Sequence, residues 1–192
     1  AVTLTLTFGI VYFLLSEGSR FFAEPGFDLV EFASGRVWQP MAGRVGVLPL
    51  VLASVQVVAI ALLFALPFGF LLSFYLYEYA SAGFRRTVRA FLEVIASVPT
   101  VVFGYFALSF VTPGLRALFG RDVVAVYNLL SAGLVVGLLI LPLVASLSLD
   151  ALMSVPPNLK DGPFAVGARR TRAFLKGVLP AAAPSLAAAA FY

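Results

Sequence analysis

The sequence contains no cysteine and no histidine, and only 11% of its 192 residues are charged. The first two absences exclude disulfides, thiolate nucleophiles, imidazole bases and the commonest zinc ligands. A G-x-x-x-x-G-K-[ST] phosphate-binding loop is also absent, which excludes ATP hydrolysis by that motif. Only carboxylates and hydroxyls remain for catalysis, so we expect neither an enzyme nor a metal or cofactor site.

The scarcity of charge also excludes an ordinary soluble domain, which carries about 25% charged residues. Hydrophobic residues make up 61% of the chain, and the mean hydropathy is +1.03. Inside a bilayer, helices satisfy every backbone polar group within one segment. The composition therefore predicts an all-α integral membrane protein, and the net charge of +4 reflects basic loops rather than nucleic-acid binding.

Membrane-spanning helices need about 20 mostly apolar residues. Five segments of a single domain, residues 1–192, meet this wholly or in part: 1–15, 45–77, 90–110, 123–149 and 179–192. The first residues lack a methionine and the basic start of a signal peptide. Because the chain begins and ends within apolar segments, we expect it to be a piece of a longer protein.

Basic residues gather in two of the four connecting loops. Arg85, Arg86 and Arg89 follow the second segment, and the loop 150–178 holds five more: Lys160, Arg169, Arg170, Arg172 and Lys176. Basic loops face the cytoplasm. The remaining two loops, including 16–44, have mixed charge, so we expect a multi-pass protein of the cell (inner) membrane with these two loops outside.

The external loop 16–44 is rich in aromatic residues, which favour the headgroup level of a bilayer. We expect a short interfacial helix at 29–33 and an anchor at Trp38. Contact with a soluble partner is the weaker interpretation of these aromatics.

Several polar residues lie within or beside the apolar segments. Pro99, flanked by Ser97 and Thr100, favours a broken helix beside a pathway, and Tyr105 adds a hydroxyl donor. For Gln56, Asn128 and Ser131, hydrogen bonding between helices is the favoured interpretation. Ion pairs that stabilise the helix ends are expected between the following residues: Glu93 with Arg89, Glu78 with Arg85 and Arg86, and Asp150 with the same basic belt.

The stretch Ser154–Pro180 predicts a helix beneath the membrane. Pro156 and Pro157 end the fourth segment, Asp161 can cap a new helix, and Gly162 and Pro163 suit its first turn. Phe164, Ala165 and Ala168 then form a small apolar face, which Gly167 interrupts. A short helix with such a face can dock into a groove of a soluble partner. An ordinary interfacial connector between two membrane segments has the same composition.

This stretch resembles the EAA loop of ABC importer permeases, in which E-A-A, a glycine and a downstream Leu-Pro occur at fixed spacing. Asp161-Gly162-Pro163 stands in place of E-A-A, Gly167 is the glycine, and Leu179-Pro180 closes the pattern. The resemblance implies that Asp161, Gly162, Pro163, Phe164, Gly167 and Ala168 form the coupling helix that docks on an ATP-binding subunit.

Two further stretches are similar to the permease of the phosphate-specific importer. They are Leu66–Gly69 with Tyr77–Ala80, and Glu93–Gly104, whose Pro-Thr-Val-Val-Phe-Gly block carries the likeness. Trp38-Gln39-Pro40 followed by Gly46–Leu50 points to the PstC-type subunit. The resemblance implies a MetI-like permease fold. It also implies three kinds of partner: a homologous PstA-type subunit, an ATP-binding dimer and an extracytoplasmic phosphate-binding protein.

The sequence is compatible with other functions. The same loop suits a permease for another oxyanion or a small organic solute, and a passive channel or membrane scaffold without an ATPase has a similar composition. A membrane enzyme would need a pair of ionisable groups within the bundle, whereas the sequence offers isolated carboxylates.

Overall fold

The computed structural model describes residues 2–23, 26–156, 159, 172 and 174–191. Among these residues, four stretches are long and apolar enough to cross a membrane: α1 (Val2–Phe22), α3 (Leu48–Glu78), Thr100–Phe119 and α7 (Leu129–Met153). A shorter apolar helical stretch follows at Phe174–Ala188. The prediction of a helical integral membrane protein is confirmed. The chain divides into two compact units, residues 1–54 and 55–192.

In the first unit, α1 is followed by the short helix α2 (Leu29–Ser34), at the position where the sequence predicts a helix. Asp28 is the N-cap of α2, and its Oδ1 accepts a hydrogen bond of 2.7 Å from the backbone N–H of Val30. Contacts between phenylalanine rings, five of them edge-to-face and one tilted, join the end of α1 to α2 with centroids 5.2 to 5.9 Å apart: Phe21, Phe22, Phe27 and Phe32.

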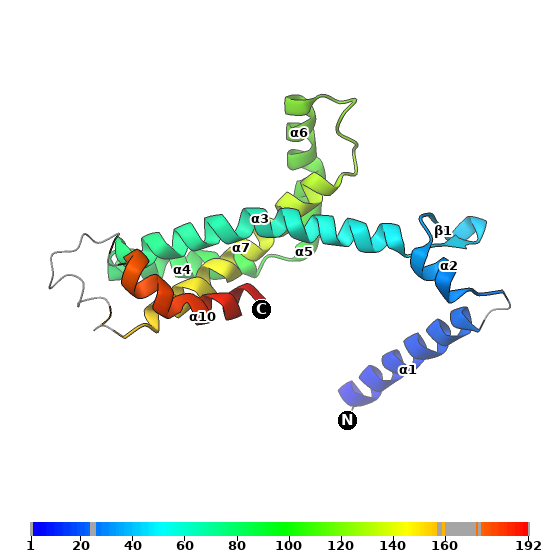
Figure 1. Ribbon diagram of the computed structural model, residues 1–192, viewed down its shortest axis with the longest axis horizontal. Coiled ribbons are helices and arrows are strands. Elements are labelled where there is room, and N and C mark those ends of the chain that lie inside the picture. The colour runs from blue at the N-terminus through cyan, green and yellow to red at the C-terminus, as the bar shows by residue number, and fades with distance from the viewer. Residues whose placement is uncertain (1, 24–25, 157–158, 160–171, 173, 192) are drawn as a thin grey trace. The chain divides into compact units, whose positions relative to one another are not determined.

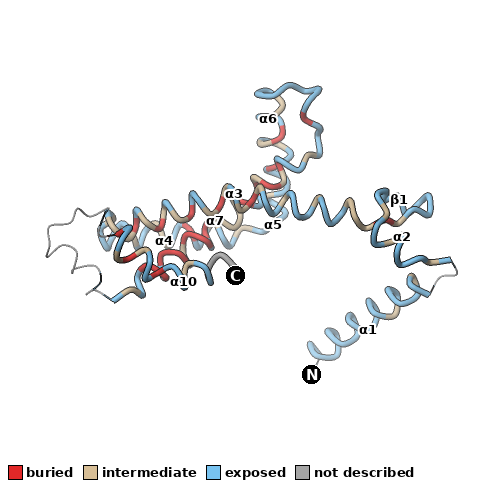
Figure 2. Tube along the Cα trace, in the orientation of Figure 1, coloured by how far each residue is buried: buried red, intermediate tan, exposed pale blue. Residues whose placement is uncertain are grey.

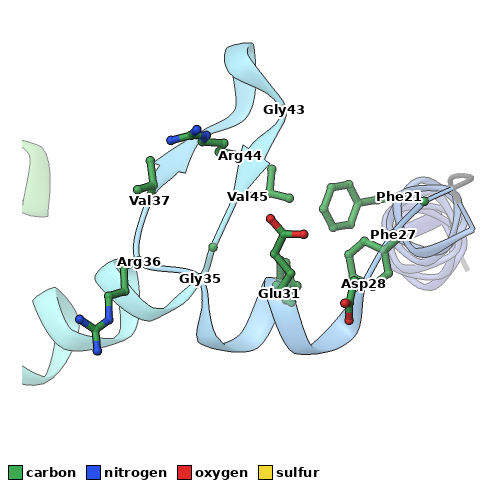
Figure 3. A pocket seen from close by; sticks show the side chains of 13 residues that line it. Phe21, Phe27, Asp28, Glu31, Gly35, Arg36, Val37, Gly43, Arg44 and Val45 are labelled. Carbon is green, nitrogen blue, oxygen red and sulfur yellow. The ribbon is translucent and has the colours of Figure 1, made fainter.

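A small hairpin completes this unit. Strands β1 (Trp38–Gln39) and β2 (Arg44–Val45) pair antiparallel around the 3₁₀ turn η1 (Pro40–Ala42). Gly35 and Gly46 touch through their backbones, because a Cβ on Gly46 would lie 2.3 Å from the carbonyl carbon of Gly35. The unit encloses a cavity of about 470 Å³. In Figure 3, Glu31 points toward the hairpin strand at this cavity and Arg36 points away from it.

In the second unit, α7 is the central helix. Helices α4 (Ala82–Ala96), α5 (Thr100–Phe106) and α10 (Leu179–Phe191) each pack against it (Figure 1). Buried residues are concentrated along α7 (Figure 2), among them Ala145, Leu149 and Leu152. This burial explains why α7 reads as almost uniformly apolar rather than amphipathic.

Helices α3 and α7 approach closely because glycines lie at their contact. A Cβ added to Gly137 of α7 would lie 2.9 Å from the backbone oxygen of Ala61, and one added to Gly133 would lie 2.6 Å from Cβ of Ile60. On α3, a Cβ at Gly69 would lie 2.7 Å from Cγ1 of Val144. Small residues at such contacts let membrane helices pack backbone to backbone.

The third apolar segment differs from the predicted range 90–110. The structure divides this region into the amphipathic helix α4, a break at residues 97–99, and the membrane-length stretch Thr100–Phe119. The residue before a proline avoids helical geometry, so Val98 ends the helical run and Pro99 becomes the N-cap residue of α5. The membrane-length stretch therefore begins at Thr100 and extends past the predicted end at 110.

Candidate functional site

The second unit holds a cavity of about 560 Å³ between the stretch Thr100–Phe119 and α7. Its wall follows one face of the first stretch from Thr100 through Gly104 and Ala107 to Thr112. The opposite wall comes from the loop before α7 and from α7 itself, mostly apolar side chains with Asn128 and Ser131 among them. The cavity thus runs along two membrane-length helices and carries a polar cluster near one end.

A π-helical turn, η2 (Ala107–Val111), lies between α5 and α6 (Thr112–Phe119) beside this cluster. Pro113 lacks an N–H, so the carbonyl of Ser109 loses its α-helical donor and the regular ladder is interrupted. In this turn the backbone N–H of Thr112 donates a hydrogen bond to the carbonyl of Ala107, five residues earlier, as in a π-helix. Such wide turns are frequent at functional sites because they re-aim backbone groups.

The polar cluster is a chain of hydrogen bonds that ends on this turn. Asn128 Nδ2 donates to Thr112 Oγ1 at 3.4 Å, Thr112 Oγ1 donates to Ser131 Oγ at 2.9 Å, and Ser131 Oγ donates to the Ala107 carbonyl at 3.2 Å. Asn128 also caps α7, because its Oδ1 accepts a bond of 2.7 Å from the Ser131 N–H. The cluster joins the start of α7 to the π-helical turn, in agreement with the interhelical role predicted for Asn128 and Ser131.

Thr112 is the member of this cluster that sequence reasoning missed. It is 2% exposed, the kind of burial that a hydroxyl tolerates when it is hydrogen-bonded. The signal was a hydroxyl beside Pro113 within an apolar stretch, since a proline there interrupts the regular helical hydrogen bonds and neighbouring polar side chains restore the bonding.

Replacing Ser131 by alanine should lower the free energy of unfolding by about 1–2 kcal/mol, because Thr112 and the Ala107 carbonyl would lose a buried partner. Denaturant unfolding of the detergent-solubilised protein would measure this. Ser97→Ala is the control, because Ser97 is exposed and its hydroxyl bonds the carbonyl of Val94 in its own turn. Equal losses in the two variants would contradict a stabilising role of the cluster.

The residues predicted to line a pathway lie at different places in the structure. Thr100 lines the cavity. Ser97 and Pro99 lie in the break between α4 and α5, and Tyr105 is 70% exposed and is not among the cavity-lining residues. A helix places neighbours on different faces, so residues close in sequence did not share one wall.

The basic belt is arranged around the ends of α3 and α7. Arg85 donates through Nε to the Leu76 carbonyl at 2.8 Å, and through a terminal nitrogen to the carbonyls of Tyr77 and Ala80 at 3.3 Å. These bonds satisfy backbone carbonyls left without donors at the end of α3. The charge also suits a helix C-terminus.

Arg89 binds Asp150 of α7 at 2.5 Å, which links α4 to the end of the central helix. The sequence predicts Glu93 as the partner of Arg89, but Glu93 is exposed and has no ion pair with any residue the structure describes. An acid placed after its base along a helix is the less favourable order, whereas Asp150 faces Arg89 across a helix contact. Arg86 is exposed, and Glu78 is half-buried at the end of α3.

The six predicted coupling residues lie outside the described residues: Asp161, Gly162, Pro163, Phe164, Gly167 and Ala168. The last part of the loop 150–178 is described, and it packs against the helices around it. Phe174 and Val178 of the π-helical turn η3 (Phe174–Val178) are buried with Leu152 of α7 and Ala182 of α10. The ring of Phe174 also lies 4.3 Å from that of Phe74, centroid to centroid, so the end of the loop is fastened to α3 as well.

Known proteins share this arrangement of sequence and fold. The chain is 28% identical over 187 residues to the probable ABC transporter permease protein YqgH of Bacillus subtilis (strain 168), covering 96% of this chain and 60% of that protein. It is 27% identical over 169 residues to the phosphate transport system permease protein PstC of Xylella fastidiosa (strain 9a5c), covering 79% of this chain and 52% of that one. The chain thus spans about half to three-fifths of the length of these relatives.

A solved structure of the MetNI methionine ABC transporter, in inward-facing conformations, has a similar fold, with a TM-score of 0.55 and 26% identity. The similarity covers 80% of this chain and 69% of that chain. Residues 65–192, which include α4 to α10 and both walls of the cavity, match the family described as binding-protein-dependent transport system inner membrane component. The chain therefore belongs to the family of inner membrane components of binding-protein-dependent transport systems.

Proposed function

We propose that this protein is the membrane-spanning subunit of an ATP-driven importer for inorganic phosphate, and a transport component rather than an enzyme. The observation that carries the proposal is the similarity, over 79% of the chain, to a protein named as the PstC permease of a phosphate transport system. The Pro99–Gly104 block and the Trp38 region support the same substrate, and the cell (inner) membrane is the proposed location.

In this proposal the cavity beside α7 is part of the route, and the loop 150–178 transmits the movement of a separate ATP-binding dimer. The anchoring of Phe174 supports this, because a loop that must move helices has to be attached to them. Arg89 and Asp150 join α4 to the same end of α7. The proposed partners are a homologous PstA-type permease subunit, the ATP-binding dimer and an extracytoplasmic phosphate-binding protein.

A small organic solute is the second candidate. The mostly apolar walls of the cavity favour it, and so does the similarity to the MetNI methionine transporter. A multivalent anion needs concentrated donors or cations, which most of this wall lacks.

Reconstitution should distinguish these functions. The whole protein, assembled with its ATPase, partner permease and binding protein in proteoliposomes, should take up radiolabelled phosphate when ATP is supplied, and sulfate, molybdate and methionine far less. Uptake of another solute without phosphate would refute the substrate and retain the transporter. If no P-loop ATPase co-purified with the protein, a channel or scaffold would be favoured.

A further inference from the structure

Arg116, in the last turn of α6, is a cation without a partner. Its Nε is buried and has no acceptor, and among the described residues its guanidinium forms neither a hydrogen bond nor an ion pair. Asp122, the nearest acid along the chain, is exposed and forms no ion pair within the described residues either. The positive charge of Arg116 therefore has no counter-charge among the described residues.

Arg116 is half-buried, and a buried N–H such as that of its Nε is unfavourable unless it is hydrogen-bonded. The C-terminal end of α6 favours the positive charge, because the helix dipole stabilises a cation there. Nε still lacks an acceptor among the described residues, so its acceptor would have to come from outside them. Guanidinium groups match tetrahedral oxyanions particularly well, since two parallel N–H groups can bind two oxygens of one anion.

The position of Arg116 relates it to the cavity. Thr112, which lines the cavity, precedes Arg116 by four residues and therefore lies on the same face of α6, one helical turn away. Arg116 is not itself among the cavity-lining residues and lies one helical turn beyond the line that runs from Thr100 to Thr112. By the distribution of loop charges, this is the end away from the cytoplasm.

The polar cluster next to Arg116 has no donor to spare. The hydroxyl hydrogens of Thr112 and Ser131 and both amide hydrogens of Asn128 are committed to one another and to the carbonyls of Ala107 and Ala125. An anion at this end of the cavity would find its strong donor in Arg116 rather than in the hydroxyls.

We propose that Arg116 binds a phosphate-type oxyanion one helical turn beyond the outer end of the cavity and selects there for the transported anion. This inference rests on the proposed function. The same chemistry has two sources, free inorganic phosphate and the phosphate of a lipid headgroup, and the inference assigns the site to free phosphate.

Chemical protection tests the site without a transport measurement. Phenylglyoxal modifies arginine side chains, and mass spectrometry gives the rate at each residue. In maltoside micelles, saturating inorganic phosphate should slow the modification of Arg116 by at least about tenfold relative to chloride at equal ionic strength, because only the unbound fraction reacts. Arg121, exposed in the following loop, is the matched control and should react at one rate throughout.

A second arm uses phospholipid nanodiscs without free phosphate. If Arg116 is protected in these nanodiscs and phosphate has no effect on its modification in micelles, the site binds a lipid headgroup. That result would overturn its role toward the transported anion. Equal modification of Arg116 under all conditions would overturn the site itself.

Transport of the assembled complex gives an independent readout. Arg116→Gln should lower phosphate uptake by about tenfold, the loss of one charge-assisted hydrogen-bonding group. Arg116→Lys should retain part of the activity, and Arg121→Gln should behave as the wild type. A destabilised Arg116→Gln with normal uptake per folded molecule would show a structural role only. If the wild type carries another solute, the proposed function fails, whereas the protection experiment still decides on the anion site.

Discussion

Replacement of Phe174 by alanine is expected to lower the free energy of unfolding of the second unit by about 3–5 kcal/mol, the usual cost of deleting a buried aromatic side chain. Phe174 is 2% exposed and belongs to the cluster that joins Leu152 of α7 to Val178 and Ala182. Its ring also contacts Phe74 and lies 6.1 Å from the centroid of Tyr77. Denaturant unfolding in detergent, monitored by circular dichroism, would measure this loss of stability.

Leu175 provides the matched control because it is the next residue and is 53% exposed. Leu175→Ala should change the free energy of unfolding by no more than about 0.5 kcal/mol. Phe174→Leu, which keeps most of the apolar volume, should fall between the two. If Phe174→Ala were no more harmful than Leu175→Ala, the attachment of this segment to α3 and α7 would be refuted.

The functional consequence of Phe174→Ala follows from its place in the chain. Phe174 lies near the end of the predicted loop 150–178, after its six predicted coupling residues, so loosening it should reduce the phosphate transported per ATP hydrolysed more than it reduces ATP hydrolysis. This expectation depends on the proposed function, whereas the loss of stability does not.

Substitution of Gly137 by leucine is expected to destabilise the second unit by about 3 kcal/mol, the upper part of the range for overpacked interiors. Any Cβ at this position would lie 2.9 Å from the backbone oxygen and 3.2 Å from Cα of Ala61, and 3.1 Å from Cδ1 of Phe64. Two of these atoms are backbone, so relief requires α3 and α7 to separate. Gly137→Ala should already be destabilising, and leucine should add to it.

Gly114 is the control for this substitution. It is also a helical glycine, but a Cβ there would meet nothing within 4 Å. Gly114→Ala should therefore raise the free energy of unfolding by about 0.5–1 kcal/mol through helix propensity alone. Opposite signs for the two substitutions would support the close contact of α3 and α7, whereas stabilisation by Gly137→Ala would contradict it.

The third apolar segment shows where sequence reasoning lost accuracy. Hydropathy merged the apolar residues on both sides of Pro99 into the range 90–110, although Arg85, Arg86, Arg89 and Glu93 already make 82–96 amphipathic. The broken helix at Pro99 was itself predicted from the sequence, and it agrees with the restriction that a proline places on the residue before it. The continuation of the helix to Phe119 was not predicted, since it depends on a π-helical turn that Ser131 supports from another helix.

In the candidate site, too, some contacts were predicted from the sequence and others were not. Thr100 lines the cavity as expected, and Asn128 and Ser131 bond across helices as the sequence favours. The partner of Arg89 was predicted four residues away and is found instead at Asp150, across a contact between two helices. Arg116, which follows the predicted segment 90–110, is placed by the structure in the last turn of a helix.

By itself, the sequence determined the membrane class, the approximate helical segments and the resemblance to importer permeases. These properties depend on composition, on sums of hydropathy along the chain and on spacing within one loop, all of which are local. Only the tertiary structure decided which side chains meet: Thr112 with Ser131, Arg89 with Asp150, Gly137 with Ala61, and Arg116 with nothing in the described chain. Those pairings depend on the rotation and register of each helix against its neighbours, which close packing sets and which no single segment encodes.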